Sequence, residues 1–218
     1  MSLGTSGISF DPAPHRYFDD EGDYASVTRV IEEAGLKPAF YRSGPAYKQR
    51  GDAVHLATED IVLGAYDDSN YTDAIHPYAN AMRKFKERYS YVPEYIELTV
   101  GSRTLRVAGR IDHIGTVLIH GQRKRWLVDI KSGTMPVPYV GVQAAGYDIL
   151  RRSYAATPDG TSHDLSRLAI DSRVCVLLKD NGDFDLSSFD GPKWTNAFNA
   201  AVCLYQLKRE HGLLSRSR

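Results

Sequence analysis

The sequence predicts an α/β protein of the α+β kind, in which helices flank a central β-sheet, and three observations support this. The chain has 218 residues, of which 42% are hydrophobic and 25% charged, enough to bury one sizeable core. The spacing of apolar residues is helical over residues 45–89, changes to a period of two near Glu94, and becomes helical again after Pro138. No low-complexity tract, internal repeat or interdomain linker divides the sequence, so we expect a single domain.

Charge and cysteine content argue against several classes of protein. The net charge is zero, which neither indicates nor excludes nucleic acid, because acidic surface elsewhere can offset a basic groove. Cys175 and Cys203 stand far apart and outside any Cys-x-x-Cys motif, so a disulfide framework, a zinc site and an iron–sulfur cluster are not expected. The sequence has no long apolar run and no charged-then-apolar leader, which predicts a cytoplasmic protein without membrane association.

The amino-terminal segment, residues 8–35, is predicted to form a short exposed hairpin followed by a helix. Its loose alternation of apolar and polar residues turns at residues 20–22, as in a hairpin of two strands. Ser26 is a suitable N-cap for the helix, and Gly35 is a suitable end.

Two helices are expected next, over about residues 45–64 and 75–89. Pro45 stands where the first turn of a helix tolerates proline, and a polar loop over residues 67–70 separates the two helices. The second helix has a basic face, which we interpret as a solvated surface, with contact to phosphates as the alternative. This face consists of Arg83, Lys84, Lys86 and Arg88.

Three strands are predicted over residues 95–100, 105–119 and 126–131. Turns at residues 101–102 and 120–121, each containing a glycine, separate them. Connections this short indicate an antiparallel meander, because parallel strands need a long crossover.

The carboxyl-terminal third is predicted to contain a helix over about residues 139–154, a hairpin and a closing helix. The hairpin pairs residues 173–178 with 183–186 through a turn that includes Asn181-Gly182. The closing helix begins near Pro192 and has an apolar stripe at helical spacing, which we interpret as core packing rather than a cofactor site. The stripe consists of Trp194, Ala197, Phe198, Ala201 and Tyr205.

Candidate chemistry begins in the strand over residues 126–131, an apolar run that contains Asp129 and Lys131. Side chains two apart share one face of a strand and lie about 6.7 Å from each other. Burying two charges in an apolar strand costs stability unless they are paired, hydrated or bound to a metal. A charged partner or a metal ion is therefore expected nearby.

Pairing the strands around the turn at residues 120–121 places Asp112 directly opposite Asp129. Directly opposed Cβ atoms are about 5 Å apart, and two carboxylates at that distance repel by roughly 3–4 kcal/mol at an effective dielectric near 20. A divalent cation between them would turn repulsion into attraction, and carboxylate oxygens suit Mg²⁺ or Mn²⁺. Two alternatives need no metal: Asp112 pairs with Arg110, or Lys131 neutralises both carboxylates.

Two of the predicted helices carry polar pairs at a spacing of four, which places both side chains on one helix face. His55 and Glu59 form one pair, and Gln143 and Tyr147 form the other. A lone histidine in a helix is more often structural than a ligand, so neither pair by itself indicates a site.

Taken together and in order, these motifs resemble the PD-(D/E)xK nuclease superfamily, and above all its RecB-type and phage exonuclease-like branch. The motifs are Gly51-x-x-x-His55, Gly109-Arg110-Ile111-Asp112, Asp129-Ile130-Lys131 and Gln143-x-x-x-Tyr147, within about residues 50–150. The segments His15-Arg16-Tyr17 and Ser26-Val27-Thr28 also resemble what precedes the core in phage-encoded members.

The resemblance implies a restriction-endonuclease-like core with a mixed central β-sheet, over about residues 45–156 of one nuclease domain spanning 1–218. A hairpin and helix at residues 8–35 would precede this core. An extra carboxyl-terminal hairpin and helix at residues 171–210 would follow it.

The resemblance also implies roles for individual residues. Asp112 and Asp129 would be carboxylate metal ligands, the backbone carbonyl of Ile130 a further oxygen ligand, and His55 a nitrogen ligand. The metal would be Mg²⁺ or Mn²⁺, and nitrogen ligation is tolerated better by Mn²⁺. Lys131 would orient or deprotonate the attacking water and help neutralise charge in the transition state.

Superfamily members often use an additional glutamate, for which Glu59 and Glu97 are the candidates. Glu59 shares the helix face of His55 and could reach the metal directly or through water. Glu97 lies on the first predicted strand and could instead pair with Arg106 across the hairpin. Both glutamates therefore stay outside the expected ligand set.

The expected function is that of a Mg/Mn-dependent deoxyribonuclease, above all an exonuclease, that hydrolyses phosphodiester bonds in recombination, repair or phage DNA processing. It would act in the cytoplasm of a bacterium or a phage-infected host. Its partners would be single- or double-stranded DNA and a recombination protein. Gln143 and Tyr147 would position the site and contact the DNA backbone, and Arg110 would contact phosphates.

Iron–sulfur members of this branch require four cysteines, so an enzyme without a cluster is expected here. One alternative is a non-catalytic DNA-binding or assembly module that keeps the fold. The other is an unrelated α/β enzyme with a structural Asp–Lys ion pair, in which His55 would lie far from Asp129. The motifs do not determine cutting mode, polarity, strand preference, DNA against RNA, or oligomeric state.

Overall fold

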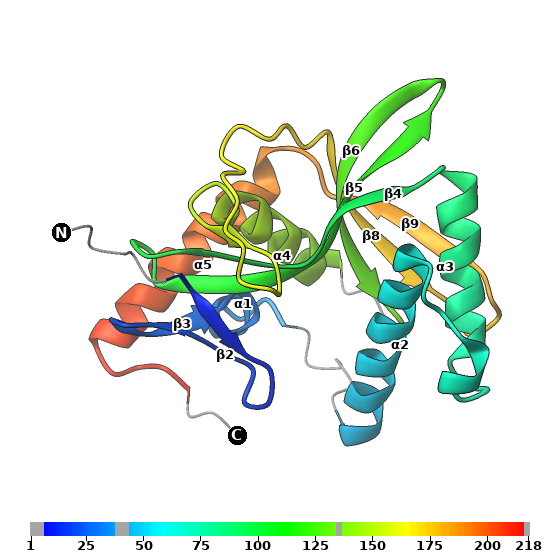
Figure 1. The fold of residues 1–218 in the computed structure, drawn as a ribbon. Coiled ribbons are helices and arrows are strands. Elements are labelled where there is room, and N and C mark those ends of the chain that lie inside the picture. Colours follow the sequence, from blue (N-terminus) through cyan, green and yellow to red (C-terminus); the bar gives the residue numbers. More distant parts are fainter. Residues whose placement is uncertain (1–6, 38–43, 134–136, 216–218) are drawn as a thin grey trace.

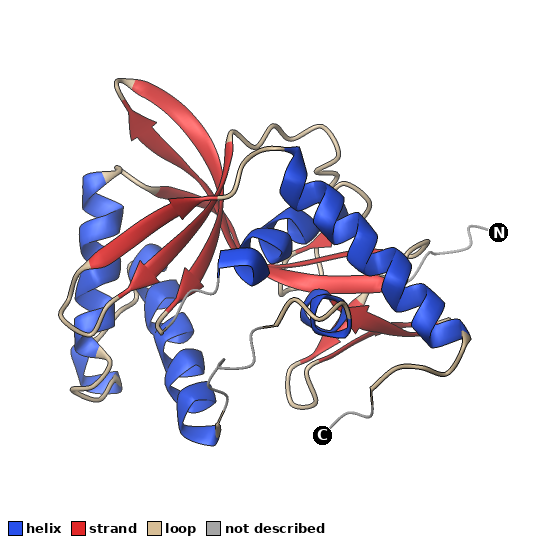
Figure 2. Ribbon diagram, turned by 180° about the vertical axis from the view of Figure 1, so that it is seen from behind, coloured by secondary structure: helices blue, strands red, loops and turns tan. Residues whose placement is uncertain are grey.

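The structure, a computed structural model, describes residues 7–37, 44–133 and 137–215. A mixed β-sheet runs through the middle of the molecule, with helices on both of its faces (Figure 1, Figure 2). This confirms the predicted class, a central mixed sheet flanked by helices. The ends of the expected domain, residues 1–6 and 216–218, lie outside the described residues.

The sheet has the strand order β1-β2-β3-β5-β6-β8-β9, with β4 on the second edge of β5 and β7 beside β4. In the described parts of the chain its strands are β1 (Ser9–Asp11), β2 (Arg16–Asp19), β3 (Gly22–Ser26), β4 (Val92–Ser102), β5 (Val107–Ile119), β6 (Gln122–Lys131), β7 (Ala155–Ala156), β8 (Ser172–Leu178) and β9 (Phe184–Ser188).

The antiparallel meander β4–β5–β6 is confirmed, with longer strands than expected. The β5–β6 ladder runs from Ile119 opposite Gln122 to His113 opposite Val128, which is the register expected for a turn at residues 120–121. The first turn lies at residues 103–106 rather than 101–102, because β4 continues to pair with β5 up to Ser102.

One edge of β5 is shared by two different strands. Strand β3 pairs in parallel with residues 107–108, and β6 pairs with residues 113–119. Within the described chain, residues 109–112 between them are paired only with β4 or left out of the ladders. This interruption places Arg110 and Asp112 where two neighbouring strands diverge.

Helices cover the sheet in two groups (Figure 1). Helices α1 (Val27–Glu33), α4 (Val137–Leu150) and α5 (Pro192–Glu210) pack on one face, around Leu127 and Ile111. Helices α2 (Pro45–Leu63) and α3 (His76–Arg88) pack on the other face, around Val128 and Ile130. Because β6 is covered on both sides, its side chains are apolar in succession rather than in alternation.

The apolar stripe of the last helix is core, as expected. Phe198, Ala201 and Tyr205 are buried, and Trp194 and Ala197 pack against the same cluster.

The amino-terminal hairpin differs from the expectation of an exposed element. Strands β1, β2 and β3 form a small antiparallel sheet, and β3 continues into the main sheet beside β5. Tyr17 and Tyr24 are buried, in a cluster with Ile8 and Ala108. The expectation was wrong because exposure depends on β5, which lies more than 80 residues further along the chain.

The carboxyl-terminal hairpin is confirmed, and its first strand has a further role. Strand β8 pairs in parallel with β6, with Asp129 opposite Cys175 and Lys131 opposite Leu177. The strand that carries both charges is therefore held on two sides, by β5 at one end and by β8 at the other. Over the described residues, no helix has the length and apolar character needed to cross a membrane.

Candidate active site

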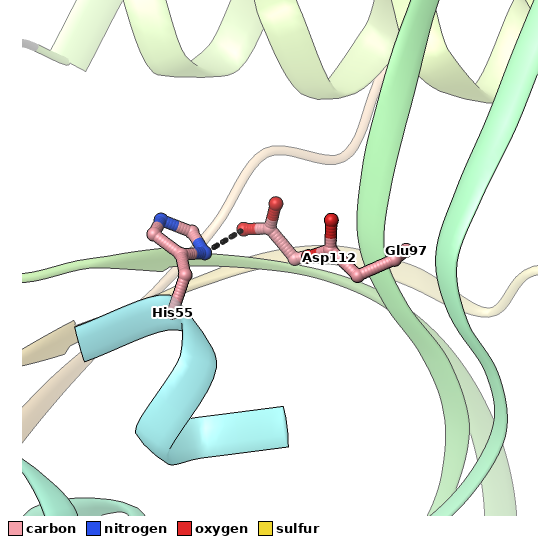
Figure 3. A group of neighbouring side chains, drawn as sticks. All are labelled: His55, Glu97 and Asp112. Carbon is pink, nitrogen blue, oxygen red and sulfur yellow. Dashed lines mark ion pairs between the residues drawn. The ribbon is translucent and has the colours of Figure 1, made fainter. Parts of the chain in front are cut away.

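His55 projects from α2 toward the sheet, where it meets Asp112 of β5 (Figure 3). Its Nδ1 atom lies 3.7 Å from Oδ2 of Asp112, and the two side chains are 34% and 15% exposed. His55 also lies within electrostatic range of Asp129: burial raises the pKa of that carboxyl, and the His55 ring is among the groups that oppose the rise. This proximity weakens the hypothesis of an unrelated enzyme in which His55 lies far from Asp129.

Asp112 lies where β5 and β6 separate. Its Oδ2 atom accepts a hydrogen bond of 2.6 Å from the backbone N–H of Ile130. The side-chain carboxylate, rather than a backbone carbonyl of β5, thus bonds that N–H just beyond the last paired residues of the two strands. Burial alone would raise the pKa of Asp112. The His55 ring, the Lys131 ammonium and the Ile130 N–H outweigh it and hold the pKa below its ordinary value.

Glu97 of β4 lies across from Asp112, between the paired residues 96–113 and 98–111. Its backbone has a φ of +51°, a left-handed conformation that is uncommon for a residue other than glycine. Its carboxylate pairs with Nε of Arg110 at 2.6 Å. The expected pairing with Arg106 is wrong, because Arg106 pairs with Asp19 at the amino-terminal sheet.

The carboxyl of Glu97 is held in an unfavourable environment for a negative charge. Burial, followed by repulsion from Asp112, raises the pKa of Glu97 to about 8, although Arg110 opposes the shift. A bound cation would reverse this balance, because it favours the charged form.

His55, Glu97 and Asp112 form a triad of potential ligands. One ligand atom from each lies within 4.8 Å of the other two, and the three side chains come from α2, β4 and β5 (Figure 3). Glu97 thus joins His55 and Asp112 as a potential ligand, and Asp129 lies beside the three. The alternation on β4 could have pointed to Glu97, but nothing in the sequence separated it from Glu59.

Asp129 and Lys131 form a buried ion pair beside the triad. Lys131 Nζ lies 2.8 Å from Oδ1 of Asp129, and the Asp129 side chain is 3% exposed. Oδ2 of Asp129 has no hydrogen-bond partner among the described residues. Burial raises the pKa of Asp129, with Lys131 opposing and Asp112 adding repulsion, while Asp129 and Asp112 raise the pKa of Lys131 against its own burial.

Gln143 and Tyr147 lie on α4 and are directly bonded to each other. Gln143 Nε2 donates to the Tyr147 hydroxyl at 2.9 Å, and both residues are buried, at 5% and 7% exposed. A Cβ atom on Gly109 would lie 2.6 Å from the Tyr147 ring, so the missing side chain at Gly109 admits that ring. Such burial favours a role in positioning the site over contact with DNA.

Two side chains of the basic face of α3 make hydrogen bonds within the protein. Lys86 donates to the backbone carbonyls of Ile61 and Val62 at 3.1 and 3.4 Å, at the end of α2. Arg83 bonds Asn80 at 2.9 Å. These contacts favour a structural role for Lys86 over binding of phosphates.

Arg50 is a residue near the site that sequence reasoning missed. It lies five residues before His55 on α2 and donates from Nη2 to the carbonyl of Ser132 at 3.3 Å. The contact ties α2 to the loop that follows Lys131. No sequence motif indicated it, because the bonded partner is a backbone atom 82 residues away.

Among known proteins, the chain has likenesses in solved structures alone, since no family model and no curated protein matches it. The crystal structure of an alkaline exonuclease (LHK-Exo) from Laribacter hongkongensis aligns at 11% identity and a TM-score of 0.37, over 88% of this chain and 95% of that one. LHK-Exo in complex with dAMP aligns at 10% identity and a TM-score of 0.35, with the same coverage. Likenesses this distant do not assign a function, which depends instead on the side chains of the site.

Proposed function

We propose that this protein is a metal-dependent DNA nuclease that hydrolyses phosphodiester bonds, an exonuclease of the PD-(D/E)xK type. The observation that carries the proposal is the convergence of His55, Glu97 and Asp112 beside the buried Asp129–Lys131 pair. A nitrogen donor, several carboxylates and a lysine at one point where strands diverge suit metal-assisted hydrolysis of a phosphate ester.

The donor set fits a divalent cation of the Mg²⁺ or Mn²⁺ kind. Ligands on one such ion sit about 2.0–2.1 Å from it, so their atoms lie up to roughly 4 Å apart, close to the separations within the triad. The unpartnered, buried Oδ2 of Asp129 is a further oxygen that a cation or its water would satisfy. The histidine nitrogen favours Mn²⁺, and the carbonyl of Ile130 remains part of the proposed set.

Each side chain has a defined part in the proposed reaction. A divalent cation, when bound, would lower the pKa of a water molecule and polarise the scissile phosphate. Asp129 and Asp112 raise the pKa of Lys131 against its own burial. This direction favours a Lys131 that orients the water and offsets transition-state charge over one that accepts a proton. Gln143 and Tyr147 would hold the wall of the site, and Arg110 would bind phosphate.

The proposed substrate is a DNA strand, single or double, in recombination, repair or phage DNA processing. The ordered motifs of the sequence support this choice. The same proposal places the enzyme in the cytoplasm of a bacterium or an infected host, with a recombination protein as a further partner.

Cleavage of DNA in the presence of Mg²⁺ or Mn²⁺ tests the proposal. The intact protein should degrade labelled DNA, and Lys131→Ala should lower kcat by about 10²–10⁴-fold. Lys124→Ala is the matched control, because Lys124 lies on the same strand with a 41% exposed side chain. No cleavage by the intact protein, or equal cleavage by Lys131→Ala, contradicts the proposal. Calorimetry without saturable binding of Mn²⁺ would indicate a non-catalytic module instead.

A further inference from the structure

The amino-terminal hairpin β1–β2 lies against the candidate active site with one of its faces. Phe10 and Tyr17 are cross-strand partners and therefore share a face, while Arg16 and Phe18 lie on the other. Burial is the main cause of the raised pKa of Tyr17; Arg110 opposes the rise, and Glu97 and Asp112 add to it. These contributions place the Tyr17 hydroxyl within electrostatic range of the site.

Phe10 holds the guanidinium of Arg110 in place. The guanidinium carbon lies 4.6 Å from the centre of the Phe10 ring, and Nε bonds Glu97 at 2.6 Å. Arg110 and Asp112 are two apart on β5 and share a face of that strand. The Arg110 side chain is 36% exposed, so a guanidinium fixed at two points faces solvent beside the triad.

His15 lies on the same aromatic platform. Its ring meets Phe10 edge-on at 5.2 Å and Tyr17 at 5.7 Å between centroids. The residue is exposed, and its backbone has a φ of +51°, which directs the chain into the turn that carries the ring. Two nitrogen donors, on Arg110 and His15, are thus oriented by one phenylalanine.

Charged groups of both signs lie within electrostatic range of the His15 ring. Although His15 as a whole is exposed, its ring contacts Phe10 and Tyr17 and is partly removed from water. This desolvation, then like charge from Arg110 and from Lys48 of α2, lowers the pKa of His15, against an opposing contribution from Asp52. Arg110 of β5 and Lys48 of α2 are thus positive groups near the His15 ring, and Asp52 of α2 is a negative one. A neutral imidazole there still donates a hydrogen bond through its N–H group.

We propose that Arg110 and His15, held on Phe10, bind a backbone phosphate of the substrate strand next to the bond that is cleaved. The β1–β2 hairpin would then take part in substrate binding rather than only extend the sheet beyond β3. Planar guanidinium groups bind phosphate through two parallel N–H donors, and the imidazole adds a third. The inference rests on the proposed function, because it names a subsite for the same DNA.

The test uses His15→Gly, which removes the ring and suits the left-handed backbone. Binding of a fluorescent oligonucleotide is measured without divalent metal, and kinetics of cleavage with Mn²⁺. We expect Kd and KM to rise about tenfold with kcat within about twofold, as for the loss of one hydrogen bond to a charged group. His15→Asn keeps a donor and tolerates the backbone, so it should stay within about threefold of the intact protein.

Arg16→Ala is the matched control on the opposite face of the hairpin, where Arg16 pairs with Asp23 at 3.6 Å. It should leave Kd and KM within about twofold. Unchanged values for His15→Gly, an equal rise for Arg16→Ala, or a loss confined to kcat would overturn the subsite. If His15→Gly unfolds at a lower temperature than the intact protein, the DNA affinity of His15→Asn tests the subsite instead. If the ring had only a structural role, the amide donor of asparagine would not restore binding. If the intact protein neither binds nor cleaves DNA, the proposed function fails; if it cleaves and His15→Gly is unaffected, only the subsite fails.

Discussion

Three features of Glu97 on β4 each disfavour the folded protein. Its backbone is left-handed, its carboxyl is mostly buried, and it lies across from a second carboxylate at Asp112. A left-handed residue other than glycine costs about 1–2 kcal/mol, and strain of this kind gathers at functional sites. Its ion pair with Arg110 offsets part of the charge. A cation bound as proposed would offset the rest.

Glu97 and Glu59 are distinguished by metal binding. Glu97→Gln should weaken binding of Mn²⁺ by at least about 10–100-fold, because it removes a carboxylate from the triad. Glu59→Gln should change the affinity by less than about threefold, because Glu59 is outside the triad and acts on Glu97 only through repulsion. Isothermal titration calorimetry of both variants measures this. A larger loss of Mn²⁺ affinity for Glu59→Gln than for Glu97→Gln would indicate that the metal lies nearer to Glu59 on α2 than to Glu97.

The raised pKa of Glu97 predicts a pH dependence of metal affinity. Below a pH of about 8 the carboxyl holds a proton that a metal ion must displace. Affinity for Mn²⁺ should therefore climb by up to about tenfold per pH unit until pH 8 and then level off. The stability of the metal-free protein should change in the opposite direction. The raised pKa means that the folded state binds a proton that the unfolded state has released, so the free energy of unfolding falls as pH rises toward 8. Calorimetry across pH 6–9 should show the slope, and Glu97→Gln should flatten it.

At the scale of elements, α4 and α5 pack closely because α4 has glycines where α5 has rings. A Cβ atom on Gly146 would lie 2.5 Å from the Phe198 ring, and one on Gly141 would lie 2.7 Å from Trp194. Phe198 is fully buried and has little room to move. The position of α4, and with it the Gln143–Tyr147 bond, depends on this close approach.

Replacing two helical glycines by alanine should have opposite effects on stability. Gly146→Ala should lower the free energy of unfolding by about 1–3 kcal/mol through overpacking against Phe198. Gly51→Ala on α2 should raise it by about 0.5–1 kcal/mol, because among the described residues a Cβ atom added there meets no atom within 4 Å and alanine favours the helix. Urea unfolding of both variants checks the pair. Two changes of the same sign would contradict the packing described for α4.

At the scale of the whole molecule, the hydrophobic core extends beyond residues 50–150, the segment that carries the motifs. One cluster joins Val30 of α1 and Phe198 of α5 to Ile111 and Leu127 of the central strands. Glu33 of α1 bonds Lys208 of α5 and the hydroxyl and backbone N–H of Ser215. The two ends of the chain thus stabilise the face of the sheet that carries Asp129.

A fragment of residues 45–156 should accordingly fail to fold alone. It keeps α4 but lacks α1, α5 and β8. The part of the apolar face that α1 and α5 cover, and the backbone of residues 129–131, would therefore be exposed. Circular dichroism should show no cooperative thermal transition for the fragment, whereas the full chain should unfold in one transition. A fragment that melts cooperatively and binds Mn²⁺ would show that the outer elements are additions to an independent core.

Much of this architecture follows from local sequence. Alternation and helical spacing predicted the meander and the main helices, because these periods depend on neighbouring residues only. The turn at residues 120–121 predicted the register that brings Asp112 toward Asp129, since a short turn leaves one pairing. The parallel neighbours β3 and β8 were not predicted, because contacts between distant segments leave no local period.

For the candidate site, sequence determined which residue types were available: a histidine on α2, aspartates on β5 and β6, and a lysine two residues beyond. Only the tertiary structure decided that Glu97 rather than Glu59 joins His55 and Asp112, and that Asp129 pairs with Lys131. It alone brought the Phe10 and His15 rings to Arg110. The physical reason is the same in each case: a charge's surroundings depend on burial and on side chains far away in sequence, and neither is encoded in the spacing of a motif.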